Sequence, residues 1–128
     1  MAQSSKRLGH LIKVQRQLKA MHEMRHATHL ADARAAAGRA AEVLEGRSGE
    51  ASMSDLFPDV YARFVERCRA EQAAAEAKAA EAAADVARET VRGEKLAQHH
   101  RDAVRAEERV AEDRAALETV EHLLAKRG

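Results

Sequence analysis

Large side chains are scarce in this sequence of 128 residues. It has two phenylalanines, one tyrosine and no tryptophan, and alanine is the commonest of its hydrophobic residues. An alanine buries little area, so this supply cannot fill the thick core of a globular domain. With 34% charged residues, the composition leaves a coiled coil or a disordered chain, and the heptads described below favour the coiled coil.

Cysteine and long apolar runs are scarce as well. Cys68 is the only cysteine, so no internal disulfide can form and a reducing compartment is indicated. No apolar run approaches the roughly 18 residues of a membrane span, and the N-terminus lacks the hydrophobic segment of a secretory signal. These absences predict a cytoplasmic protein, although the basic stretch before Glu23 is also typical of an organelle transit peptide.

Two glycines, three serines and the only proline of the sequence lie close together between Gly46 and Pro58. After Pro58 the sequence has a single glycine, Gly93, until its last residue, in a stretch of Ala, Glu, Arg, Lys and Gln that is typical of one long helix. We predict an all-α fold of two long helices in an antiparallel coiled-coil hairpin, with the second helix longer than the first. The predicted segments are a loose leader (1–5), a first helix (6–45), a Gly/Ser turn (46–54) and a second helix (55–127).

The ends of the predicted helices carry capping residues. Ser4 or Ser5 can cap the first helix, and Gly46 is expected to end it as a C-cap glycine. Ser52 or Ser54 can cap the second helix. Pro58 fits the first helical turn, because its missing N–H would have no partner there.

Apolar residues three and four apart predict the packed face of each helix. In the first helix we expect this face to hold Leu8, Leu11, Val14, Leu18, Met21, Thr28, Ala31, Ala35 and Gly38. In the second we expect Val60, Phe64, Cys68, Ala75, Ala79, Ala82 and Val86. A hairpin that turns near residue 50 then places Leu18 opposite the Ala82 region and Leu8 opposite the Arg92 region.

A heptad repeat marks the end of the chain. Apolar residues recur at intervals of seven or fill the complementary core position, and they are Leu96, Ala103, Ala106, Val110, Leu117, Val120 and Leu124. His99 and Asp113 interrupt this seam. Because the first helix is expected to end its coverage before Leu96, residues 96–126 are predicted to project as an uncovered seam, and such seams bind partners.

The sequence offers little chemistry. His22, His26 and His29 share one arc of the first helix; they could hold a metal ion, but no fourth ligand is evident, so we predict a solvated face and no metal or cofactor. No phosphate-binding glycine loop and no nucleophile beside a base are present, which predicts a protein without enzymatic activity. Residues 1–45 are basic but lack aromatic residues for base stacking, which argues against nucleic-acid binding.

The layout resembles a known family. The segment Tyr61-Ala62-Arg63-Phe64-Val65 follows the bend, and the second helix continues with Glu94-Lys95-Leu96, Arg105-Ala106-Glu107-Glu108, Asp113 and Leu117. A short first helix, a Gly/Ser bend and these segments resemble FliJ, the small coiled-coil component of the flagellar type III export apparatus. The injectisome proteins of the YscO type share the layout, so the residues leave the two export systems open.

The resemblance implies a stalk that sits in the pore of the hexameric export ATPase. It also implies binding to the cytoplasmic domain of the export-gate membrane protein FlhA, escort of export chaperones, and a place peripheral to the inner membrane when assembled. Carried over from the family, the gate contact falls on Tyr61, Phe64, Val65 and Cys68. Where the family's face continues with a small residue and a histidine, this chain has Glu71 and Ala75.

Residues of the C-terminal half are the candidates for contact with the ATPase or with a second helix. They are Leu96, Arg105, Arg109, Val110, Leu117, Val120 and Leu124. Two alternatives remain open. The chain could be a structural homodimer in which two C-terminal seams pair, or residues 6–25 could form a basic amphipathic helix that binds nucleic acid or a membrane.

Overall fold

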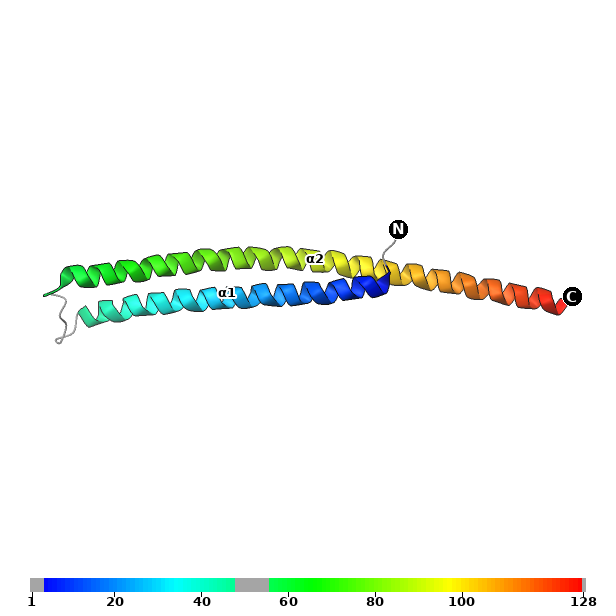
Figure 1. The fold of residues 1–128 in the computed structure, drawn as a ribbon, viewed down its shortest axis with the longest axis horizontal. Coiled ribbons are helices and arrows are strands. Elements are labelled where there is room, and N and C mark those ends of the chain that lie inside the picture. The colour runs from blue at the N-terminus through cyan, green and yellow to red at the C-terminus, as the bar shows by residue number, and fades with distance from the viewer. Residues whose placement is uncertain (1–3, 48–55, 128) are drawn as a thin grey trace. The chain divides into compact units, whose positions relative to one another are not determined.

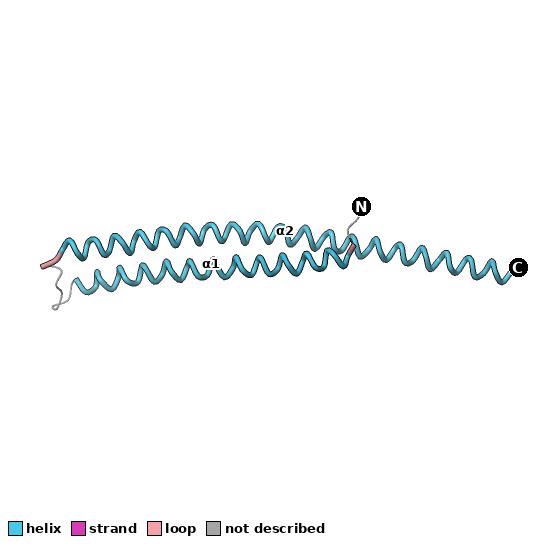
Figure 2. The backbone as a smooth tube through the Cα atoms, viewed as in Figure 1, coloured by secondary structure: helices cyan, strands magenta, loops and turns pink. Residues whose placement is uncertain are grey.

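Two α-helices make up the computed structural model, which describes residues 4–47 and 56–127. Helix α1 spans Ser5–Arg47 and helix α2 spans Pro58–Arg127. Figure 2 shows these helices in the described ranges, in which no strand occurs. The predicted all-α class and the longer second helix are confirmed.

Both helix starts follow from their capping residues. The Ser4 hydroxyl oxygen accepts a hydrogen bond from the Arg7 N–H at 3.2 Å, and the Ser4 carbonyl accepts one from Leu8 at 3.1 Å. This is the N-cap expected from the sequence. Pro58 begins α2 as predicted, and the Tyr61 N–H donates to the Phe57 carbonyl at 3.3 Å. Helix α2 therefore starts three residues later than predicted.

The end of α1 differs from the prediction. Helix α1 runs on through Gly46 to Arg47, and no glycine in the described ranges has a positive φ. Gly46 is thus a helical residue and not a left-handed C-cap. A glycine costs a helix only about 1 kcal/mol relative to alanine, which does not by itself end it. The rest of the predicted turn, including Ser52 and Ser54, and residues 1–3 of the leader lie outside the described residues.

The chain divides into two compact units, each containing a part of both helices. The first unit comprises Met1–Leu18 and Glu89–Gly128, and the second comprises Lys19–Arg88. Figure 1 shows the segments by colour, with α1 in blue to cyan and α2 in green to red.

The second unit packs through small side chains. Its buried residues on α1 are Ala33, Ala36 and Ala40, and those on α2 are Val65, Cys68, Ala75, Ala79 and Ala82. Alanine faces let two helix backbones approach closely, but each contact buries little area. Arg39 of α1 and Glu71 of α2 add an exposed ion pair at 2.8 Å. Four of the residues predicted for the packed face of α2, Cys68, Ala75, Ala79 and Ala82, are confirmed.

The first unit buries a polar residue of α1 against α2. Gln15 of α1 is only 7% exposed, and its amide Nε2 donates a hydrogen bond of 2.6 Å to the backbone carbonyl of Glu89 on α2. Gly93, one turn further along α2, provides the space. A Cβ at Gly93 would lie 2.8 Å from Oε1 of Gln15. A glutamine therefore fits here only because residue 93 has no side chain.

The packed face of α1 is not the predicted one. Leu8 is buried as expected, but Leu11, Val14, Leu18 and Met21 are exposed, as are Thr28, Ala31, Ala35 and Gly38. The less exposed positions include Ser5, Leu8, Ile12 and Gln15 in the first unit and Lys19, His22, His26, His29, Ala33, Ala36, Ala40 and Val43 in the second, with Gly9, Leu30 and Ala37 beside them. These positions also follow a regular spacing of three and four. Periodicity therefore fits both faces, and hydrophobicity favoured the wrong one.

The pairing of the helices is also displaced from the prediction. In the first unit Ser5 contacts Glu107, the imidazole of His100 lies 4.0 Å from the Cβ position of Gly9, and Gln15 contacts Glu89. Leu8 lies between Ser5 and Gly9, so it is opposite residues 100–107 and not opposite the Arg92 region, as was predicted. Within each unit, the paired residue of α2 has a lower number as that of α1 rises, as it does in an antiparallel pair.

Candidate partner-binding surface

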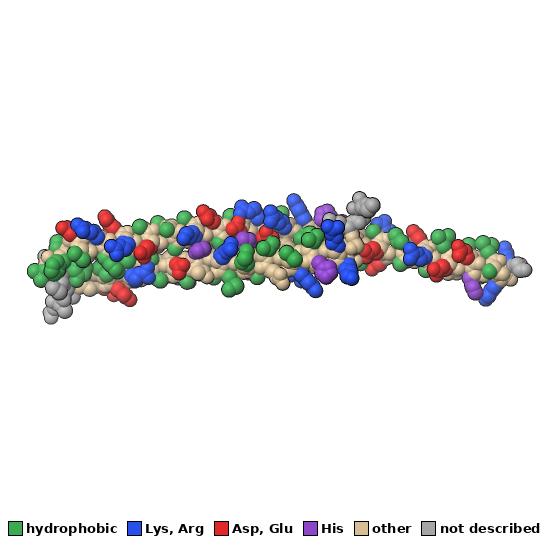
Figure 3. Space-filling view, in the orientation of Figure 1, with side chains coloured by type: hydrophobic (Ala, Val, Ile, Leu, Met, Phe, Trp, Pro, Cys, Tyr) green, Lys and Arg blue, Asp and Glu red, His purple; other side chains and the backbone are tan. Residues whose placement is uncertain are grey.

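The last part of α2 is a helix that the described part of the chain does not cover. Every residue from 108 to 127 is exposed. Its apolar residues include Val110, Leu117, Val120 and Leu124, whose exposed fractions are 57, 62, 52 and 61%. Figure 3 shows hydrophobic side chains at the surface here, among acidic ones. We call residues 108–127 the uncovered segment.

The uncovered segment begins where α1 begins. The Glu107 carboxylate accepts hydrogen bonds from the Ser5 N–H at 3.0 Å and from the Ser5 hydroxyl at 2.6 Å. These two bonds lower the pKa of Glu107 below its usual range, because they stabilise the ionised carboxylate. The carboxylate also lies at the N-terminus of α1, where the helix dipole favours negative charge.

The predicted seam is therefore shorter than the sequence indicated. Leu96 is partly buried in the first unit, and the same holds for Ala103 and Ala106. The prediction that residues 96–126 are uncovered was wrong for its first part, because α1 reaches Glu107. Arg105 and Arg109 are exposed on either side of this limit. Val110, Leu117, Val120 and Leu124 lie together on one stripe of the uncovered segment.

Comparisons with known proteins add nothing to this geometry. No family model, no curated protein and no solved structure matches the chain.

The residues proposed for the gate contact lie at the start of α2, in the second unit. Val65 and Cys68 are 7% and 2% exposed, so both pack against α1. Tyr61 and Phe64 are only partly buried. Glu71 pairs with Arg39, and Ala75 is buried. Of the four candidates, Tyr61 and Phe64 thus keep surface that a partner could contact.

His22, His26 and His29 of α1 face α2, contrary to the predicted solvated face. His26 Nδ1 lies 2.9 Å from the carbonyl oxygen of Ala79. His22 Nδ1 lies 3.7 Å from a carboxylate oxygen of Asp85, and its ring nitrogen is buried without a hydrogen-bond partner. His29 is partly buried. These positions on the packed side of α1 were not predicted, because a polar imidazole is expected to face solvent.

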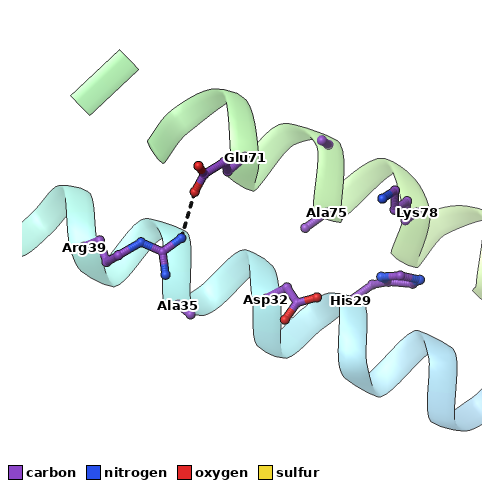
Figure 4. A pocket seen from close by; sticks show the side chains of 8 residues that line it. His29, Asp32, Ala35, Arg39, Glu71, Ala75 and Lys78 are labelled. Carbon is purple, nitrogen blue, oxygen red and sulfur yellow. Dashed lines mark hydrogen bonds and ion pairs between the residues drawn. The ribbon is translucent and has the colours of Figure 1, made fainter. Parts of the chain in front are cut away.

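A shallow hollow lies beside these residues in the second unit. It has a volume of about 360 Å³ and is lined by His29, Asp32, Arg39, Glu71 and Lys78, with alanines between them. Figure 4 shows Arg39 and Glu71 turned toward each other across it. The hydrogen bond from Arg39 to Glu71 raises the pKa of the guanidinium, which stays protonated at any physiological pH. Opposite charges pair here, and the hollow is open to solvent.

The described residues contain no group of three His, Cys, Asp or Glu side chains that could hold a metal ion. His22 and His26 each face a different residue of α2, Asp85 and Ala79, so they do not converge on one point. Between residues 4 and 47 and between 56 and 127, no helix is long and apolar enough to cross a membrane.

Proposed function

We propose that this protein is a non-enzymatic stalk and adaptor of a type III protein export apparatus, flagellar or injectisome. In this proposal the two helices form one antiparallel coiled-coil hairpin. The uncovered segment binds the hexameric export ATPase, and the start of α2 contacts the cytoplasmic domain of the export gate. The observation that carries the proposal is the exposed apolar stripe on residues 108–127.

The stripe provides enough apolar surface for a specific contact. Burying a valine or leucine side chain fully is worth about 1.5–3 kcal/mol, and the stripe offers Val110, Leu117, Val120 and Leu124. Part of this energy offsets the loss of freedom on binding. The exposed arginines, Arg105 and Arg109, would act mainly on the rate of association and on its salt dependence.

The gate contact rests on fewer residues than the family resemblance implies. Tyr61 and Phe64 retain exposed surface, whereas Val65 and Cys68 hold α2 against α1. In the proposal, Tyr61 and Phe64 touch the gate, and Val65 and Cys68 position them. The escort of export chaperones is part of the same proposal and would use either surface.

Co-purification with a hexameric export ATPase tests the proposal. The double variant Leu117→Asp with Leu124→Asp places two charges on the stripe, and we expect it to abolish co-purification because charged groups cannot be buried unpaired. The matched control is Ala111→Asp with Ala115→Asp, which adds the same charges to the opposite side of the segment. The control should bind as the unaltered chain does.

Circular dichroism of both variants must show that helicity is retained. If the control loses the ATPase as completely as the stripe variant, charge and not the stripe controls binding, and the proposal fails. It fails as well if the unaltered chain does not bind the ATPase.

A further inference from the structure

The first unit has a second apolar stripe that the described residues leave exposed. Leu11, Val14 and Leu18 of α1 are 40, 52 and 39% exposed. They lie three and four residues apart, and Arg7 precedes them by four. At 100° per residue these four positions share one face, turned by about a third of a turn from the buried face that holds Leu8 and Gln15. We call Arg7, Leu11, Val14 and Leu18 the outer stripe.

The N-terminal part of α1 is basic, and all but the end of the uncovered segment is acidic. Residues 5–18 include Lys6, Arg7, Lys13 and Arg16 and no acidic residue. Residues 108–121 of the uncovered segment contain five acidic residues and two arginines, and Lys126 and Arg127 follow at its end. Figure 3 shows Lys and Arg side chains beside the hydrophobic ones on the N-terminal part of α1. The charge of residues 108–121 is therefore opposite in sign to that of residues 5–18.

The two stripes also have the same spacing. Asp113, Leu117, Val120 and Leu124 follow one another at intervals of four, three and four, as the residues of the outer stripe do. Laid side by side in parallel, they place Asp113 next to Arg7. Leucine then meets leucine and valine meets valine at three successive layers, which is the layer pattern of a parallel coiled coil.

We propose that the uncovered segment of one chain docks on the outer stripe of a second copy. Within one chain this contact cannot form, because α2 continues as a helix past Ser5 and carries its last 20 residues away from the N-terminal end of α1. In a pair of copies related by a two-fold axis the contact forms twice, and no stripe is left over. The result is a closed dimer with two identical contacts.

The dimer does not depend on a role in protein export. Dimerisation and ATPase binding would use the same stripe, so a chain can do only one of them at a time. The outer stripe is needed for the dimer alone.

Charge reversal provides the test, with molar mass measured by sedimentation equilibrium on the full chain at micromolar concentration. We expect the unaltered chain to dimerise, and Arg7→Asp and Asp113→Arg each to weaken the dimer by about tenfold or more, because each opposes two like charges in a seam. The variant with both changes restores the pair of opposite charges at both contacts. It should dimerise as the unaltered chain does. Arg16→Asp, which lies off the outer stripe, is the matched control and should leave the dimer intact.

Cross-linking distinguishes this dimer from one in which two uncovered segments pair. In a background with Cys68→Ser, cysteines at both Leu11 and Leu117 should form a disulfide-linked dimer on mild oxidation. A cysteine at Leu117 alone should not. Efficient linkage of Leu117→Cys alone would overturn the proposal in favour of paired uncovered segments.

Three further outcomes would overturn it. They are a chain that sediments at the 14.0 kDa of a monomer, a double charge reversal that does not restore the dimer, and a monomeric chain whose outer stripe binds vesicles of anionic lipid instead. Leu11→Asp separates the two proposals, since it should abolish the dimer and leave co-purification with the ATPase intact or increased, because the stripe of the uncovered segment is then free.

Discussion

At the scale of single residues, the register of the first unit depends on a glutamine and a glycine. Gln15 is buried and bonded to the Glu89 carbonyl, and Gly93 leaves room for it. Glu89 is itself 4% exposed and bonded to Arg92 at 2.7 Å. A polar group buried in a coiled coil can specify one register, because any shift leaves it without its partner. Neither residue stands out in the sequence by hydrophobicity.

Gly93→Ala tests this pair. Alanine in place of a helical glycine normally stabilises a helix by about 1 kcal/mol. Here its Cβ would displace the Gln15 amide and break a buried hydrogen bond worth about 1 kcal/mol. We expect no gain, or a loss, in the free energy of unfolding measured in urea. In a Gln15→Ala background the same change should gain about 1 kcal/mol. An equal gain in both backgrounds would show that the two residues are not coupled.

Glu107 gives the start of α1 a dependence on pH. Its pKa is lowered in the folded chain by the Ser5 bonds, so its contribution is present at neutral pH. The contribution is lost as the pH falls below the ordinary value of 4.5 and through the lowered pKa. We expect faster amide hydrogen exchange at Ser5 and the following residues at acidic pH, after correction for intrinsic exchange. Glu107→Gln should show the faster exchange already at neutral pH, and the exposed Glu108→Gln should not.

At the scale of elements, the two helices show what periodicity can and cannot decide. The face of α2 was partly predictable, because Cys68, Ala75, Ala79 and Ala82 follow a helical spacing, although exposed alanines such as Ala74 and Ala83 stand beside them. In α1 two faces fit the same spacing of three and four. The leucine face was chosen by hydrophobicity, but the face of alanines and histidines is the one packed on α2. Which face is used depends on fit to the partner helix, and a single helix does not contain that information.

Two neighbouring alanines of α1 test this choice. Ala36 is 1% exposed and Ala35 is exposed, whereas the sequence placed Ala35 in the core. Ala36→Asp should lower the free energy of unfolding by about 3 kcal/mol or more, because it buries a charge without a partner. Ala35→Asp should change it by less than about 1 kcal/mol. Urea unfolding followed by circular dichroism measures both. The opposite order would restore the face predicted from the leucines.

At the scale of the whole molecule, the fold class and the candidate partner-binding surface could be predicted from the sequence to different degrees. The scarcity of aromatic residues and the long stretch without proline were enough to predict two helices of unequal length. The heptads were enough to place Val110, Leu117, Val120 and Leu124 on one surface. The beginning of that surface was not predictable, because it depends on the Ser5 contact with Glu107 and therefore on the register between helices.

The uncovered segment has one more consequence, for its own rigidity. The last turn of a helix leaves its backbone carbonyls without partners within the helix, so an unpacked helix frays from its free end, and residues 108–127 gain nothing from tertiary packing within the described chain. The hydrogen bonds of this segment should therefore open from its free end, while those next to Glu107 stay closed. A partner that binds this segment therefore contacts a stable helix next to Glu107 and fraying turns at the other end. Part of its binding energy has to offset the entropy lost when those last turns become ordered.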